Sequence, residues 1–158
     1  METLSSKSFE KTSDLLELTQ SIHQKIKRHY EKQKASIEDP EAKMLLDYIT
    51  RKEEVLESTI SSYRKVASTD VLDGFYQFSP AEIKTLDDHT AWQPDSNASP
   101  GDVLAAALRI DSSMQALYRH AARMAPNEPI RDLFNSLAEA VKSKKQDQAS
   151  NASLLKDL

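Results

Sequence analysis

The chain has 158 residues, of which 39% are hydrophobic and 29% charged, as is typical of one globular domain with a buried core. A net charge of −4 gives no general attraction to nucleic acid or to an anionic membrane, and the lack of cysteine excludes disulfides and thiolate chemistry. Because two glycines are too few for the tight turns of a sheet protein, we predict a single all-α domain over residues 1–158.

The first predicted helix covers residues 12–37, and Ser13 is a candidate for its N-cap. His23 and Tyr30 lie on the helix face that should bury apolar side chains, which raises the question of why that face carries polar groups. The apolar and aromatic positions with helical spacing are Leu15, Leu18, Ile22, Ile26 and Tyr30.

The second predicted helix covers residues 41–68 and follows a short break in which Pro40 is suited to a helix start. A connection this short makes the first two helices antiparallel neighbours. The positions predicted to point inward are Leu45, Leu46, Ile49, Val55, Leu56, Ile60 and Tyr63.

Residues 69–100 interrupt the helical pattern and are predicted to cross the molecule, because so long a connection is unusual within a compact domain. Ser79-Pro80-Ala81-Glu82 predicts the start of a short helix within them. The aromatic residues that we expect to attach this crossover to the helices are Phe75, Tyr76, Phe78 and Trp92.

The third and fourth predicted helices cover residues 101–124 and 129–148. In the fourth helix the apolar pattern fades after Val141, so its last turns are predicted to be polar and frayed. Two helical hairpins joined by one long crossover have the connectivity of a ferritin-like four-helix bundle.

An internal repeat relates the two predicted hairpins. A shift of 88 residues places His23 on Asp111 and Tyr30 on Tyr118 without any gap. The same shift aligns inward positions of the second and fourth helices, namely Leu46 with Phe134, Ile49 with Leu137, Glu53 with Val141 and Leu56 with Lys144.

These repeated residues resemble the rubrerythrin branch of the ferritin-like superfamily across roughly residues 12–148. In that family each hairpin carries a Glu, a Tyr seven residues later, and Glu-x-x-His on its second helix, and together these residues hold a di-iron site. The family tyrosines are matched by Tyr30 and Tyr118. The resemblance therefore implies that His23 and Asp111 occupy two positions of carboxylate metal ligands.

The metal ligands implied by the resemblance are mostly altered in this chain. Glu53 remains, whereas the two family histidines are replaced by Leu56 and Lys144, and the second motif Glu by Val141. A reduced site of His23, Glu53 and Asp111 could hold a single iron, manganese or zinc ion. The alternative is a polar core without metal, in which Lys144 neutralises the two carboxylates.

The function expected from these features is that of a non-enzymatic binding or structural protein that has lost the di-iron chemistry of its relatives. The chain contains no Gly-rich phosphate loop and no serine nucleophile elbow. The alternative function is a metal-binding redox or iron-handling protein. We expect a homo-oligomer such as a dimer, with no nucleic-acid or membrane partner. We also expect a cytoplasmic location, because the segment METLSSKSFEKTSD lacks an apolar targeting sequence.

Overall fold

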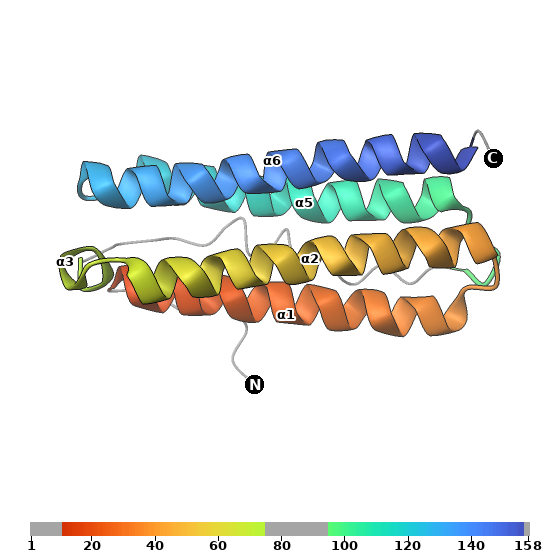
Figure 1. Ribbon diagram of the computed structural model, residues 1–158, viewed down its shortest axis with the longest axis horizontal. Coiled ribbons are helices and arrows are strands. Elements are labelled where there is room, and N and C mark those ends of the chain that lie inside the picture. Colours follow the sequence, from red (N-terminus) through yellow and green to blue (C-terminus); the bar gives the residue numbers. More distant parts are fainter. Residues whose placement is uncertain (1–10, 75–94, 157–158) are drawn as a thin grey trace.

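The computed structural model describes residues 11–74 and 95–156, and every regular element within these ranges is a helix (Figure 1). This confirms the all-helical prediction for the described residues. The helices are α1 (Thr12–Ser36), α2 (Pro40–Val66), α3 (Thr69–Leu72), α5 (Pro100–Arg123) and α6 (Glu128–Lys156).

The four long helices form two hairpins that lie side by side (Figure 1). One hairpin consists of α1 and α2, and the other of α5 and α6, with the most extensive packing inside each hairpin. The hairpins meet chiefly because α2 packs against both α5 and α6. Side chains from all four helices therefore reach a common interior.

Local capping explains where the helices begin. The Asp39 side chain accepts hydrogen bonds from the backbone N–H groups of Glu41 (2.9 Å) and Ala42 (3.4 Å), and Pro40 occupies the first position of α2 as predicted. Ser99 and Asp102 form a reciprocal capping box at the start of α5. These caps satisfy backbone donors that have no partner within the helix.

The predicted cap at Ser13 is wrong. Helix α1 begins one residue earlier, and its first N–H, that of Thr12, donates to the backbone oxygen of Gly74 at 3.0 Å. At the other end of α1, the N–H of Glu38 donates to the oxygen of Ser96 at 3.0 Å. The two described ends of the predicted crossover therefore lie at opposite ends of α1.

The crossover region contains a feature that the sequence pattern did not predict. Helix α3 has four residues and is capped by the Ser68 side chain, and it is too short to show a helical period. The helix predicted to start at Ser79 and the aromatic residues 75, 76, 78 and 92 lie outside the described residues.

Two predicted positions in the long helices need correction. Val55 was expected to point inward but is 63% exposed, because the buried stripe of α2 passes through Glu53 and Leu56 instead. The fourth helix does not end at residue 148 but continues to Lys156, and it buries Lys144 and Gln148 in the stretch predicted to be polar and frayed. Interior partners therefore keep the end of α6 against the protein.

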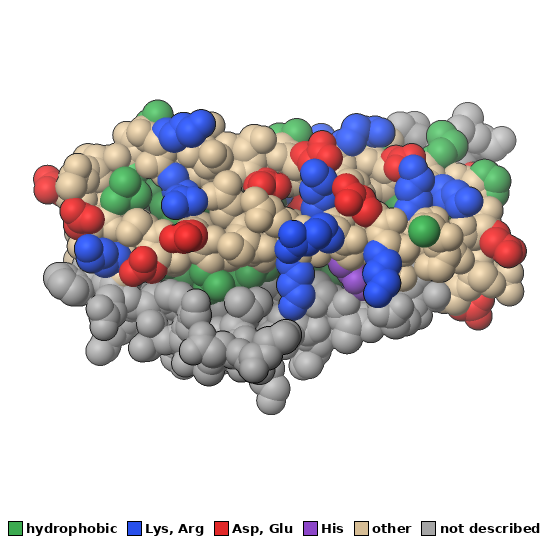
Figure 2. All heavy atoms as spheres, turned by 90° about the horizontal axis from the view of Figure 1, so that it is seen from below, with side chains coloured by type: hydrophobic (Ala, Val, Ile, Leu, Met, Phe, Trp, Pro, Cys, Tyr) green, Lys and Arg blue, Asp and Glu red, His purple; other side chains and the backbone are tan. Residues whose placement is uncertain are grey.

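The outer surface carries charges of both signs. Figure 2 shows Lys and Arg side chains interspersed with Asp and Glu over one face of the molecule. Some of these charges form ion pairs, such as that of Lys27 with Glu54, in which Nζ lies 3.1 Å from Oε1. None of the described helices is long and apolar enough to cross a membrane.

Candidate functional site

Six polar side chains from the four long helices meet in the interior, and we call them the charged cluster. Each is at most 4% exposed, and burial of so many polar groups requires that they satisfy one another. The members are His23 of α1, Glu53 of α2, Asp111 and Tyr118 of α5, and Lys144 and Gln148 of α6.

His23 uses both ring nitrogens within the charged cluster. Its Nδ1 contacts Oε1 of Glu53, and its Nε2 lies 2.9 Å from the hydroxyl of Tyr118. The His23 and Tyr118 rings are stacked with their centroids 6.1 Å apart. The imidazole therefore links α1 to both α2 and α5, which answers why the inward face of α1 carries a histidine.

Lys144 joins the two carboxylates of the charged cluster. Its Nζ lies 2.6 Å from Oδ1 of Asp111, which accepts a hydrogen bond, and 2.8 Å from Oε2 of Glu53. The contact with Glu53 lacks good hydrogen-bond direction, so we regard it as an ion pair. The second oxygen of Asp111 accepts a hydrogen bond from Gln148 Nε2 at 2.7 Å.

These contacts govern ionisation in the charged cluster. Burial raises the pKa of Glu53, but Lys144 and His23 outweigh it and lower that pKa to about 2, so Glu53 is a carboxylate at neutral pH. Burial lowers the pKa of Lys144, but Asp111 and Glu53 outweigh it and raise that pKa above its ordinary value. Burial, together with the charge of Glu53, raises the pKa of Asp111 despite its contact with Lys144.

Hydrogen bonds continue from the charged cluster toward α1. The carboxylates of Glu53 and Asp111 face the single ammonium of Lys144, and Glu53 also contacts His23. The His23 Nε2 lies 2.9 Å from the Tyr118 hydroxyl, and a side-chain hydrogen bond also joins Tyr118 to Thr19. The Thr19 hydroxyl in turn donates to the backbone oxygen of Leu16 at 3.0 Å.

The two repeated tyrosines have different surroundings. Both are fully buried, and burial raises the pKa of each, so both are neutral phenols. The Tyr118 hydroxyl bonds to His23, whereas the Tyr30 hydroxyl has no hydrogen-bond partner among the described residues. In the second hairpin the residue equivalent to His23 is Asp111, whose oxygens accept from Lys144 and Gln148, and the residue equivalent to Thr19 is Ala107, which has no hydroxyl.

Lys144 occupies the position between the carboxylates of the predicted metal site. His23, Glu53 and Asp111 do come together as predicted, but the ammonium of Lys144 lies between the two carboxylates, where a metal cation would have to bind. Among residues 11–74 and 95–156, no group of three or more His, Cys, Asp or Glu side chains has a metal-binding arrangement. A lysine held as an ammonium has no lone pair to offer a metal.

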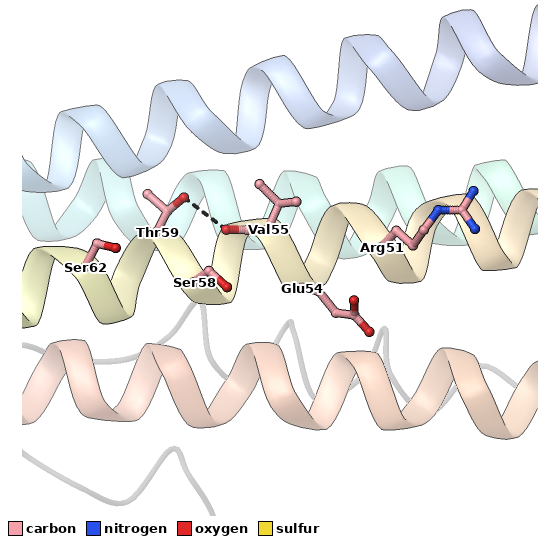
Figure 3. A pocket seen from close by; sticks show the side chains of 6 residues that line it. All are labelled: Arg51, Glu54, Val55, Ser58, Thr59 and Ser62. Carbon is pink, nitrogen blue, oxygen red and sulfur yellow. Dashed lines mark hydrogen bonds between the residues drawn. The ribbon is translucent and has the colours of Figure 1, made fainter.

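The charged cluster is closed to solvent on its described sides. A surface hollow of about 530 Å³ lies on α2, and Figure 3 shows the side chains that line it, from Arg51 to Ser62. A second hollow of about 290 Å³ lies between α5 and α6 and is lined by Arg119, Arg123 and Arg131. Neither hollow is lined by a member of the charged cluster, so neither gives a substrate access to it.

Sequence reasoning missed two of the residues that complete the site. Gln148 lies one helical turn after Lys144 and shares its inward face, but it falls in the stretch predicted to be polar and frayed. Thr19 lies one turn before His23, and this spacing was the only signal of its role. The side chains of both residues form hydrogen bonds with residues of other helices, so their role depends on the tertiary structure.

Comparison with known proteins identifies no relative of this chain. No family model, curated protein or solved structure matches it.

Proposed function

We propose that this protein is a non-enzymatic binding or structural protein with a ferritin-like four-helix bundle, in which an internal ion-pair network replaces a di-iron site. The observation that carries this proposal is the position of Lys144, whose Nζ lies 2.8 Å from Glu53 and 2.6 Å from Asp111. A permanent side-chain cation there supplies the charge that a bound metal would otherwise provide.

Two further features support the proposal. The members of the charged cluster come from both hairpins, so the network holds the hairpins together and has a structural role of its own. The cluster is also buried, and the two surface hollows described above do not open onto it. A reaction centre would need a route by which substrate reaches it.

Elemental analysis of protein purified without chelator tests the proposal against the metal-binding alternative. We expect well below one iron, manganese or zinc ion per chain, because a lysine occupies the position between the carboxylates. A stoichiometric metal that is lost in Glu53→Ala but retained in Glu57→Ala would instead establish the redox or iron-handling function. Glu57 is a suitable control because its carboxylate bonds to Gln24 in an exposed contact.

A further inference from the structure

Helix α2 carries an unusual line of exposed apolar side chains. Four large hydrophobic side chains are exposed in the described part of the chain, and three of them belong to α2: Met44 (57%), Val55 (63%) and Val66 (78%). They are eleven residues apart, which is close to three full helical turns, so all three lie along one side of the helix. Single apolar residues on a surface are ordinary, so the regular spacing of these three along one side of the helix is the feature that suggests a contact surface.

We propose that this side of α2 binds the same side of α2 in a second copy of the chain, antiparallel to it, about a twofold axis at Val55. Equal spacing on either side of Val55 makes the line complementary to itself. The axis brings Val55 against the partner's Val55, and Met44 against the partner's Val66. A twofold homodimer requires a self-complementary surface of this kind.

The shape of the surface at the proposed axis suits close packing of two helices. Val55 is one of the residues that line the hollow of about 530 Å³ on α2. Figure 3 shows the others, which are the charged side chains of Arg51 and Glu54 and the small side chains of Ser58, Thr59 and Ser62. Small side chains at a crossing point allow two helix axes to approach each other closely. Val55 of one copy would therefore pack into the hollow of the other.

Charges beside the line also fit an antiparallel pair. Asp47 lies eight residues before Val55 and Lys65 ten residues after it, on the same flank of the line. The twofold axis places Lys65 opposite the partner's Asp47. Along the helix axis the two residues are then offset by about 3 Å. Asp47 already contacts Lys34 at 2.6 Å but stays 44% exposed, so it can accept a second cation. The pairing occurs twice in the dimer.

This interface does not depend on the proposed function, because none of its residues belongs to the charged cluster. Sedimentation velocity over a concentration series measures it directly. We expect the unmodified chain to form a dimer, and Val55→Glu to weaken dimerisation by about tenfold or more. Met124→Glu is the matched control, because Met124 is the fourth exposed apolar side chain (49%) and lies outside α2. Circular dichroism verifies that both variants remain helical.

A charge exchange tests the orientation of the two helices. Lys65→Glu and Asp47→Lys should each weaken the dimer, and the double variant should recover it, because both pairs are restored with reversed sign. The proposal is overturned if the unmodified chain is a monomer throughout the series, or if Val55→Glu behaves like Met124→Glu. If Val55→Glu leaves dimerisation unchanged while substitutions on another surface weaken it, the interface lies on that other surface.

Discussion

Replacing Lys144 with methionine removes the ammonium that lies between two buried carboxylates and preserves most of the side-chain volume. Glu53 and Asp111 would then lose the ammonium that both contact, and Glu53 would keep its contact with His23. We expect Lys144→Met to lower the free energy of unfolding substantially, because an uncompensated buried charge is costly.

The buried contacts of Lys144 set the order of magnitude of this effect. Lys144 and His23 outweigh the effect of burial and lower the Glu53 pKa from 4.5 to about 2, a net stabilisation of the carboxylate of roughly 3 kcal/mol. Loss of the contact with Asp111 adds to this. Breaking a buried ion pair typically costs about 3–5 kcal/mol, and we expect Lys144→Met to fall in this range.

Denaturant unfolding at neutral pH, followed by circular dichroism, measures the change. Lys52→Met is the matched control, because Lys52 pairs with Asp147 at 3.2 Å on the surface and its removal should cost about 0–1 kcal/mol. Combining Glu53→Gln with Lys144→Met should recover part of the loss. A Lys144→Met effect as small as that of Lys52→Met would refute the buried ion-pair network.

Three further outcomes are expected from the charged cluster. In denaturant unfolding, Tyr118→Phe should cost about 1–3 kcal/mol, because it leaves the buried Nε2 of His23 without its hydrogen-bond partner. Tyr30→Phe should cost nothing or stabilise the protein, since the Tyr30 hydroxyl has no partner in the described structure. The lowered pKa of Glu53 contributes stability above pH 4.5 that is lost as the pH falls toward about 2. Glu53→Gln should therefore flatten the stability profile over this acid range, and an unchanged slope would argue against a paired Glu53.

The sequence by itself determined most of the secondary structure of this protein. Local signals are enough to start a helix, as the Asp39 cap with Pro40 and the Ser99 capping box demonstrate. The period of the apolar residues set the inward faces, and the repeat correctly directed attention to His23, Glu53 and Asp111. These features depend on residues within a few turns of one another.

Only the tertiary structure decided how those inward polar residues are satisfied. Lys144 and Gln148 lie in a stretch of α6 without a clear apolar pattern, and they turn inward because carboxylates from α2 and α5 lie opposite them. In α2, pairing across helices also explains why the predicted inward position of Val55 was wrong. Glu53 contacts His23 of α1 and Lys144 of α6 and occupies the interior, and the apolar Val55 remains on the surface. Pairing across helices outweighs the ordinary preference of each side chain, and no local pattern encodes it.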